Sequence, residues 1–364
     1  MNDTWEQEWL AQTDTDGRPN LIKSNTGIRL KAATYNVAEY CMKSSSGATK
    51  QHIWEKPEKL LAIRRWISET DADILMVTED ATYLDADGTK HGAKLLYNDR
   101  YPSWQGGWPR IRSRFPVIRP KKANGKELTL IEVKPPKNAT PRSDGKSSSR
   151  YFAFGTAEIE GKTVLLFTVH PRNSYIPYDS NPKVGPVADR MNFLQIVFDL
   201  VYCLKDKRIT DGICNLKNWD YVVIGGDFNT SNRNGYDPKT GKDYKAGEED
   251  WNNLAKLRNH YRFDSANGGY LGWVTTFPDG KEALDNILVS GNVILESIKA
   301  DSEWYPELYS DHVPLVTTMT LLDGKDATRF PDRTHEGKTV EKDLKQLRAW
   351  LKELLTGVID HPCV

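Results

Sequence analysis

The sequence has few cysteines, no long apolar run and no excess of either charge. Its four cysteines, Cys41, Cys203, Cys214 and Cys363, form no CxxC pair, which argues against a zinc knuckle or a disulfide scaffold. No stretch approaches the roughly 18 to 20 apolar residues of a membrane helix. The first residues lack the basic and apolar regions of a signal peptide. We therefore expect a cytoplasmic protein with reduced thiols and no membrane partner.

Basic and acidic residues balance at 50 each over the 364 residues, which argues against a protein that coats nucleic acid by bulk electrostatics. Hydrophobic residues make up 38% of the chain, enough to bury a sizeable core. The charge is nevertheless uneven, because residues 108–150 hold twelve basic residues against three acidic ones. This basic segment is either a phosphate-facing surface or an ordinary solvated loop region, and composition favours neither.

The hydrophobic pattern divides the chain into a polar arm (1–27), a central domain (28–322) and an extension (323–364) that carries an amphipathic helix. Apolar runs predict buried strands at 28–37, 74–77, 164–169, 221–224, 283–289 and 313–319. Helical spacing predicts helices beginning at Pro57 and Pro186. The last helix, with Leu344 and Leu354 on its apolar stripe, is expected to dock on the domain. Together these elements indicate an α+β or sandwich-like layered fold.

Polar residues recur where the predicted strands begin or end. Ligand sites are usually built at such positions, because the rigid sheet positions the loops at its rim. Taken singly, each has an ordinary explanation, since Asp and Asn favour turns and a histidine is more often packed than catalytic. The full set is Asn36, Glu79, His170, Asp227, Asn229, Asp285, Asp311 and His312. It is the set as a whole that indicates a catalytic site.

In this order, the segments resemble those of the endonuclease/exonuclease/phosphatase superfamily, which has the fold of deoxyribonuclease I and exonuclease III. The matching segments are Thr34-Tyr35-Asn36-Val37, Ile74-Leu75-Met76-Val77-Thr78-Glu79, Ser113-Arg114-Phe115-Pro116, Thr168-Val169-His170, Gly226-Asp227-Phe228-Asn229, Leu284-Asp285-Asn286-Ile287-Leu288 and Ser310-Asp311-His312-Val313-Pro314. The resemblance implies an α+β, deoxyribonuclease I-like fold: a four-layered α/β sandwich of two packed β-sheets flanked by helices. It also implies a divalent metal at the rim of the sheets.

The resemblance implies a metal site that suits the chemistry of phosphodiester hydrolysis, which needs charge neutralisation and an activated water. Glu79 is expected to be the main carboxylate ligand of Mg²⁺ or Mn²⁺, since hard cations favour oxygen donors. Asn36 and Asp311 are expected to complete or support that site.

The resemblance also implies catalytic roles for four further residues. His312 is expected to act on the attacking water or on the phosphate, with Asp285 orienting its imidazole. Asp227 is expected to position or deprotonate the water, and Asn229 to donate to a phosphate oxygen. Whether His312 or Asp227 is the general base stays open, because family members differ on this point.

Substrate contacts are expected from residues near the end of the predicted strand at 164–169. In the deoxyribonuclease I branch a histidine at the position of His170 is the general acid, and the alternative here is a packing role. Arg172 and Asn173 follow it and are candidates to reach a phosphate, as is Arg150 before the preceding strand. Arg114 is expected to be structural or to contact the nucleic-acid backbone.

The sequence departs from the family pattern at three places. Thr78 stands where a Gln usually precedes the metal-binding Glu, and Asn286 stands where an aromatic or basic residue is common. A polar insertion at 231–249 replaces the usual loop. These departures leave the metal and histidine residues intact but affect the choice of substrate.

Three functions remain open on the sequence. The first is a metal-dependent phosphodiesterase acting on DNA, an endonuclease or exonuclease, with the basic segment following the backbone and Trp104, Trp108 or Trp273 stacking on bases. The second is the same chemistry on an inositol phosphate, a nucleotide or a lipid head group. The third is a catalytically silent adaptor, which the intact set of site residues argues against. The oligomeric state is open.

Overall fold

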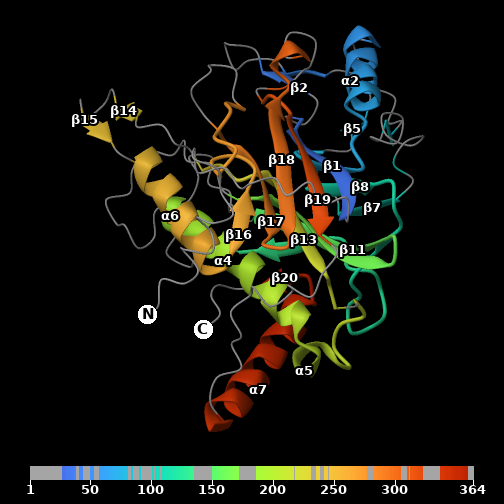
Figure 1. Cartoon of the computed structure of the whole chain (residues 1–364), viewed down its shortest axis with the longest axis vertical. Coiled ribbons are helices and arrows are strands. Elements are labelled where there is room, and N and C mark those ends of the chain that lie inside the picture. Colours follow the sequence, from blue (N-terminus) through green and yellow to red (C-terminus); the bar gives the residue numbers. More distant parts are fainter. Residues whose placement is uncertain are drawn as a thin grey trace.

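The structure is a computed structural model in which two mixed β-sheets pack face to face with helices on their outer faces (Figure 1). It describes residues 27–37, 41–43, 50–52, 57–80, 83–84, 90–91, 101, 103–106, 109–134, 150–171, 186–216, 218–230, 235–237, 242–244, 246–276, 283–304, 310, 312–322 and 337–359. Among the helices described there, none is long and apolar enough to cross a membrane. The arm at 1–26 lies outside the described residues.

The first sheet has six strands in the order β18-β19-β1-β4-β8-β7. At its centre, β1 pairs in parallel with β4 and antiparallel with β19. The bounds are β1 Gly27–Asn36, β4 Ile74–Thr78, β7 Ser103–Gly106, β8 Arg110–Ser113, β18 Val293–Ala300 and β19 Leu315–Leu322.

The second sheet has eight strands in the order β16-β17-β13-β12-β11-β10-β20, with β9 also pairing with β11. Here β12 and β13 are parallel, whereas β17 runs antiparallel to β13. The bounds are β9 Val117–Ile118, β10 Ile131–Val133, β11 Arg150–Ile159, β12 Lys162–His170, β13 Tyr221–Asp227, β16 Phe263–Ser265, β17 Asp285–Ser290 and β20 Val358–Ile359.

The remaining elements are helices and three short hairpins. The helices are α2 Pro57–Thr70, α4 Pro186–Lys205, α5 Lys207–Thr210, α6 Ala246–His260, the 3₁₀ helix η3 Ser302–Trp304 and α7 Gly337–Leu354. The hairpins pair β2 Cys41–Lys43 with β3 Lys50–His52, β5 Tyr83–Leu84 with β6 Lys90–His91, and β14 Gly235–Asp237 with β15 Lys242–Tyr244.

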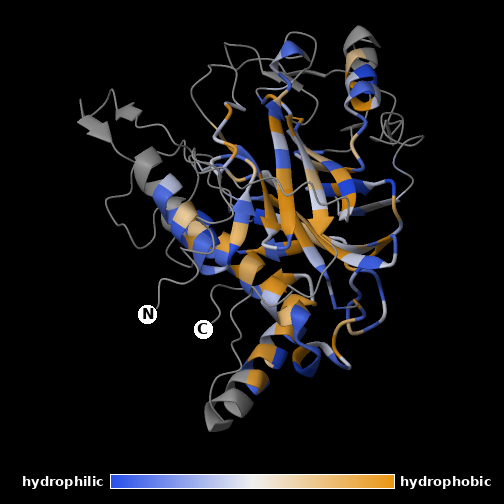
Figure 2. Ribbon diagram, in the orientation of Figure 1, coloured by the Kyte–Doolittle hydropathy of each residue, from blue (hydrophilic) through white to orange (hydrophobic). Residues whose placement is uncertain are grey.

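Three hydrophobic clusters correspond to the three interfaces between four layers. One cluster lies between the sheets and includes Met76 and Val223. The second joins α2 to the outer face of the first sheet through Trp66, and the third joins α4, α6 and α7 to the second sheet. Figure 2 shows the apolar residues concentrated on the central strands. The predicted four-layered sandwich is therefore confirmed.

The two sheets are in close contact just below the carboxyl end of β13. A Cβ added to Gly225 would collide with the sulfur of Met76 on the opposite sheet. Glycine at this position leaves room for the end of the Met76 side chain, which would have to move if a Cβ were present. The next inward-facing position of β13 is Asp227, so the hydrophobic contact between the sheets lies directly beneath a polar layer.

The predicted central strands and helices are present within a few residues of their expected bounds. The strand expected at 283–289 is β17 and the one at 313–319 is β19. Short strands such as β9, β10 and β20 were not predicted, because two or three residues carry too little periodicity. Cys203 and Cys214 are both free thiols.

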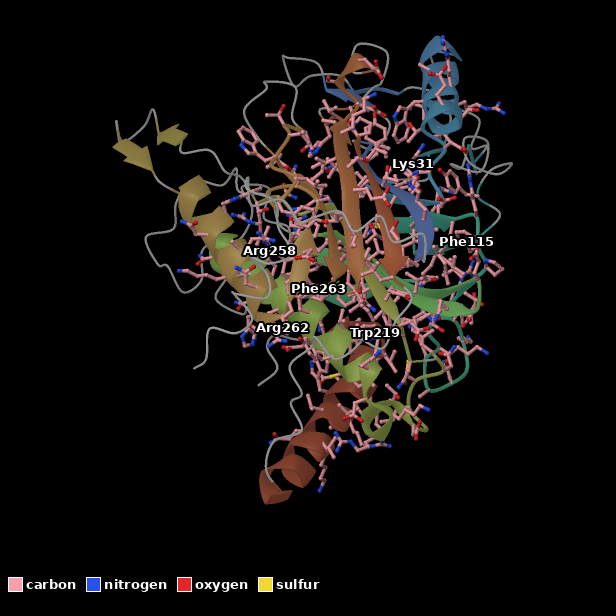
Figure 3. The ribbon with its side chains drawn as sticks, in the orientation of Figure 1. Lys31, Phe115, Trp219, Arg258, Arg262 and Phe263 are labelled. Carbon is pink, nitrogen blue, oxygen red and sulfur yellow. The ribbon has the colours of Figure 1, made fainter. Side chains whose placement is uncertain are left out.

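The extension is joined to the second sheet by both packing and pairing. Leu351 and Leu354 are fully buried in the cluster beneath α4, and β20 pairs in parallel with β10. At the same interface, Trp219 (labelled in Figure 3) is buried and donates from Nε1 to the Val201 carbonyl of α4 at 3.0 Å. The predicted docking of the leucine stripe is therefore confirmed.

We expect Leu351→Ala to lower the free energy of unfolding by about 2–5 kcal/mol, because it opens a cavity in the core. Lys352→Ala, at the next and exposed position of α7, should change it by less than about 0.5 kcal/mol. Urea unfolding followed by circular dichroism measures both. Equal effects of the two substitutions would contradict the docking of α7.

Candidate active site

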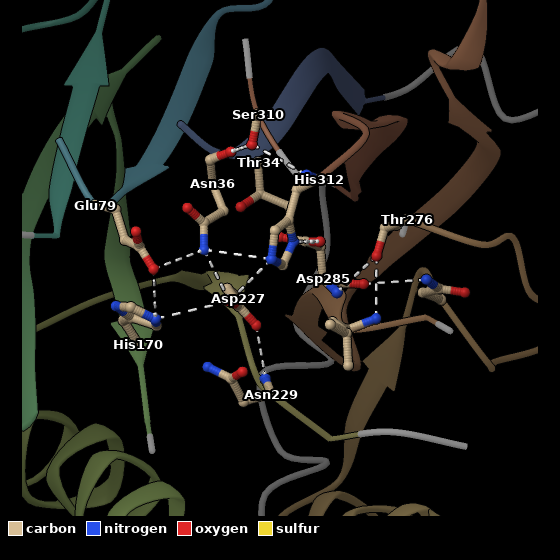
Figure 4. Close-up of polar contacts among 12 residues, drawn as sticks. Thr34, Asn36, Glu79, His170, Asp227, Asn229, Thr276, Asp285, Ser310 and His312 are labelled. Atoms are coloured by element: carbon tan, nitrogen blue, oxygen red, sulfur yellow. Dashed lines mark hydrogen bonds and ion pairs between the residues drawn. The ribbon is translucent and has the colours of Figure 1, made fainter. Parts of the chain in front are cut away.

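Strand direction brings the predicted polar residues to one rim of the sandwich. Asn36 ends β1, and Glu79 follows β4, which is parallel to β1. His170 and Asp227 end the parallel pair β12 and β13. Asp285 begins β17, which runs the opposite way and so starts at the same rim. His312 precedes β19, antiparallel to β1, for the same reason. Figure 4 shows these side chains converging.

Asp285 and His312 form a buried carboxylate–imidazole pair. His312 Nδ1 lies 2.7 Å from Asp285 Oδ2, and the Asp285 side chain is fully buried. The backbone of Asp285 is fixed on both sides, since its N–H donates to Thr276 Oγ1 and its carbonyl accepts from Asn267 Nδ2, each at 3.0 Å. A carboxylate in this position fixes the tautomer of the ring and stabilises its cation, so Nε2 is presented to the site.

Asp227 lies where three polar side chains meet. Its Oδ2 accepts a hydrogen bond from Asn36 Nδ2 at 2.9 Å and lies 3.6 Å from Nε2 of both His312 and His170. Burial raises the pKa of the Asp227 carboxyl, and the two histidines oppose that rise while Asp285 adds to it. A buried carboxylate with a raised pKa and a histidine at 3.6 Å is suited to proton transfer.

Glu79 is the most exposed carboxylate of the group, with 20% of its side chain accessible against 2% for Asp227. Its Oε1 lies 3.7 Å from His170 Nε2 and accepts from Asn36 Nδ2 at 3.3 Å. Glu79 has a left-handed backbone with a φ of 55°, which is uncommon outside glycine. The Glu79 carboxylate is therefore held by contacts with Asn36 and His170 and is still accessible to solvent.

Two further residues tie the loops of the site to the strands. Ser310 Oγ donates to the Asn36 carbonyl at 2.5 Å and accepts from the His312 N–H at 3.0 Å. Asn229, also left-handed with a φ of 51°, donates from its N–H to Asp227 Oδ1 and from Nδ2 to the Pro171 carbonyl. One donor group of Asn229 is thus directed at backbone in this structure.

Two sets of residues at the rim offer ligands to a cation. Asp227, Asp285 and His312 present ligand atoms within 4.8 Å of one another and form a group able to bind a metal. Binding there would compete with the 2.7 Å contact between Asp285 and His312. Glu79 carries carboxylate oxygens, the donors that Mg²⁺ and Mn²⁺ prefer, and leaves that pair intact. Asn36 directs Nδ2 at Glu79 and Asp227 and would offer its amide oxygen to a cation by turning the amide group. The donor chemistry of the rim therefore fits a hard divalent cation.

The structure brings together seven of the predicted site residues: Asn36, Glu79, His170, Asp227, Asn229, Asp285 and His312. Arg150 begins β11 beside the Tyr151–His170 pair, so it lies at the same end of the second sheet. Asp311, Arg172 and Asn173 lie outside the described residues. Trp104 lies in β7 and Trp108 outside the described residues.

In the part of the basic segment that the structure describes, four arginines pair with acids and so do not form one open phosphate-binding surface. Arg110 and Arg112 bind Asp80, and Arg114 binds Asp71 and Asp73. These acids lie outside the segment in sequence, so counting charge along the chain overstated the local excess. Arg119 likewise pairs with Glu127. Arg114 takes the structural role expected of it.

Lys121 lies at the end of the second sheet away from the site. Its N–H donates to the side chain of Asn215, in the segment that leads into the start of β13. Asp227 is at the other end of that strand. The described lysines around this position therefore do not extend the catalytic rim.

Sequence reasoning missed several residues that hold the site. Thr276 has no motif that marks it, and Ser310 was quoted only as part of a segment. Asn286 was treated as a departure affecting substrate, but it is buried and its Oδ1 accepts from Ser265 and from the N–H groups of Asn267 and Ile287. It fixes the loop at 266–276 to the strand that carries Asp285.

Comparison with known proteins agrees with this geometry. The model of the Endonuclease/Exonuclease/phosphatase family matches residues 33–312, more than half of the chain. The chain belongs to this family, whose members are phosphoric ester hydrolases. Comparison with curated protein sequences finds no match.

Solved structures of the same fold share little sequence with the chain. An endonuclease/exonuclease/phosphatase from Beutenbergia cavernae DSM 12333 is 16% identical, with a TM-score of 0.51 over 80% of this chain and 72% of that one. A family protein from Bacteroides thetaiotaomicron is 14% identical, with a TM-score of 0.47 over 82% and 100%. Sphingomyelinase C from Streptomyces griseocarneus is 16% identical, with a TM-score of 0.42 over 80% and 99%. The first of these supports the fold alone.

We expect Asp227→Asn to stabilise the metal-free protein at pH 7. Burial raises the pKa of this carboxyl above 3.8, so the unfolded chain loses the proton at a lower pH than the folded one. The free energy of unfolding therefore falls as pH rises from about 3.8 through the folded pKa. Removing the charge should add about 0.5–2 kcal/mol at pH 7, and the gain should shrink toward pH 4.

Urea midpoints measured in EDTA across this pH range test the expectation. Asp211→Asn, at an exposed carboxylate, is the matched control and should give a small, pH-independent change. A midpoint for Asp227→Asn below that of the wild type at pH 7 would contradict the unfavourable burial of this charge.

Proposed function

We propose that the chain is a divalent-metal-dependent phosphodiesterase that hydrolyses DNA as an endonuclease or exonuclease. The observation that carries the hydrolytic part is the buried Asp285–His312 pair, whose Nε2 faces Asp227 at 3.6 Å beside Glu79 and His170. An oriented imidazole next to a buried carboxylate is the arrangement needed to activate a water for attack on phosphorus. Membership of a family of phosphoric ester hydrolases supports it.

In this proposal Glu79, Asn36 and Asp311 hold Mg²⁺ or Mn²⁺. The cation, when bound, neutralises charge on the phosphate and on the leaving oxygen. His312, held by Asp285, and Asp227 lie close enough to share the proton of the attacking water, and which of them is the base stays open. His170 faces both Glu79 and Asp227, and is assigned proton donation to the leaving group.

Substrate contacts complete the proposal. Arg150, at the site end of β11, and Arg172 and Asn173, which follow His170 in the sequence, are assigned to phosphate groups flanking the scissile bond. Asn229 is assigned the phosphate oxygen, with the second hydrogen of its Nδ2, since the first donates to Pro171.

Supercoiled plasmid incubated with Mg²⁺ or Mn²⁺ tests the activity. We expect metal-dependent nicking that EDTA removes and that His312→Ala lowers by about 10²- to 10⁴-fold, the usual contribution of a general acid or base. His260→Ala, at an exposed histidine on α6, is the matched control and should keep wild-type activity. Metal-independent nicking, or nicking that survives His312→Ala, would refute the proposal.

Trp273 offers a way to separate DNA from a small ester as the substrate. Its side chain is 54% exposed, and it lies three residues before Thr276, which holds Asp285. The neighbouring Val274 is fixed by two hydrogen bonds to the buried Asn267 side chain. An exposed indole on a fixed loop suits base stacking, which contributes about 1–3 kcal/mol per base.

We therefore expect Trp273→Ala to weaken single-stranded DNA binding by about 5- to 100-fold while sparing hydrolysis of bis(p-nitrophenyl) phosphate, which has no base to stack. Fluorescence anisotropy and absorbance measure the two. Equal losses on both substrates would contradict a stacking role and indicate general damage to the rim.

A second candidate is the same chemistry on a small phosphorylated substrate: an inositol phosphate, a nucleotide or a lipid head group. The observation that favours it is the pairing of Arg110, Arg112 and Arg114 with acids, which removes them from any extended contact with a nucleic-acid backbone. Intact plasmid together with metal-dependent hydrolysis of a small diester would favour this candidate over DNA.

A further inference from the structure

The chain reverses its alternation of side chains at Glu79. In β4, Met76 faces the core between the sheets and Val77 faces α2. In a continued strand, residue 79 would face α2 and residue 80 the interior, since successive side chains point to opposite faces. The left-handed φ of 55° at Glu79 breaks this order. Its carboxylate instead lies at the rim between the sheets, 3.7 Å from His170 Nε2.

Two arginines of β8 hold Asp80 on the face of the first sheet that is turned toward α2. Its Oδ2 lies 2.8 Å from Arg112 Nη2 and 3.1 Å from Arg110 Nη1. These arginines pair in the sheet with Leu75 and Val77, the β4 residues that face α2. The Asp80 side chain is fully buried, and those of Arg112 and Arg110 are only 4% and 17% accessible.

This arrangement holds the backbone at Glu79 in a conformation that the chain alone disfavours. A left-handed glutamate persists only where the surroundings determine it. Asp80 cannot leave its position without breaking two ion pairs in a buried site, which is strongly unfavourable. Because Asp80 is the next residue, its anchoring fixes the direction in which the Glu79 side chain leaves the backbone.

We propose that Asp80, clamped by Arg110 and Arg112, is a positioning residue that directs the Glu79 carboxylate toward the divalent cation. This inference rests on the proposed function, because it takes Glu79 as the cation's carboxylate ligand. The clamp acts through geometry and carries two positive charges for one negative. The net positive charge of the clamp therefore opposes cation binding. If all three charged side chains are replaced together, a loss of cation affinity reports the lost geometry, because the change in charge acts in the opposite direction.

The test is the triple variant Asp80→Val/Arg110→Met/Arg112→Leu, which replaces the buried charges by apolar side chains, a change that proteins often tolerate. Binding of Mn²⁺ alone, without substrate, is measured by electron paramagnetic resonance, with thermal melting and near-ultraviolet circular dichroism as the checks of fold. We expect Mn²⁺ affinity to fall by about 10- to 100-fold in the folded variant, as for other residues that orient metal ligands. Loss of one net positive charge would by itself strengthen cation binding.

Arg114→Met is the matched control, because it also removes one positive charge from an arginine paired with acids beside β4, but at the end of that strand far from Glu79. Its Mn²⁺ affinity should equal that of the wild type or exceed it slightly. If the triple variant does not fold, Arg110→Met removes the longer and more accessible contact of the clamp. It should then give a smaller loss in Mn²⁺ affinity.

Glu79→Gln distinguishes failure of this inference from failure of the proposed function. A large loss of Mn²⁺ affinity in Glu79→Gln together with wild-type affinity in the folded clamp variant would overturn the clamp and keep Glu79 as ligand. Wild-type affinity in Glu79→Gln would overturn both, because the carboxylate being positioned would not bind the cation. Lower Mn²⁺ affinity in both Glu79→Gln and the triple clamp variant, with unchanged affinity in Arg114→Met, would support the clamp.

Discussion

The alternation of side chains along the central strands is the constraint on which the site depends. One face of β1, β4, β12 and β13 supplies the apolar contact between the sheets, and that contact closes at Gly225 and Met76. The next inward positions along the strands are polar, so Asn36, His170 and Asp227 extend the same face beyond the core. Their spacing is then set by the packing of the two sheets rather than by any loop.

A charged side chain buried at this rim is unfavourable unless it is paired with an opposite charge or hydrogen-bonded. Asp285 is paired with His312, and Asp80 with two arginines, so these carboxylates are held in fixed geometry. Asp227 lies 3.6 Å from Nε2 of both His170 and His312, and burial nevertheless raises its pKa. Neighbouring carboxylates in unequal environments can take different roles. The paired Asp285 and Asp80 suit a structural role, and Asp227, with its raised pKa, suits proton transfer. In the proposed function the cost of burying Asp227 is retained because its carboxylate takes part in proton transfer.

Charge along the chain was a poor guide to the surface. The basic segment at 108–150 was compatible with either a phosphate-facing surface or a solvated loop region. Its residues Arg110, Arg112 and Arg114 pair with acidic residues at positions 71, 73 and 80, from another stretch of the chain. Asn286, which appeared to affect substrate, instead fixes the loop that supports Asp285. Both findings have one cause, since pairing across the fold depends on which residues meet in space, and sequence separation does not report that.

The sequence by itself determined the central strands and helices and the residues at the strand ends, because periodicity and motifs are local properties that survive without coordinates. The four layers followed from the resemblance of these segments to the family. The sequence named Asn36, Glu79, His170, Asp227, Asn229, Asp285 and His312, and the structure brings these seven together. Only the tertiary structure decided how they are held. The hydrogen bond from Ser310 to the Asn36 carbonyl, the hydrogen bond from the Asp285 N–H to Thr276 and the ion pair between Arg112 and Asp80 join residues between nine and 274 positions apart. These contacts exist only once the sheets and loops have packed.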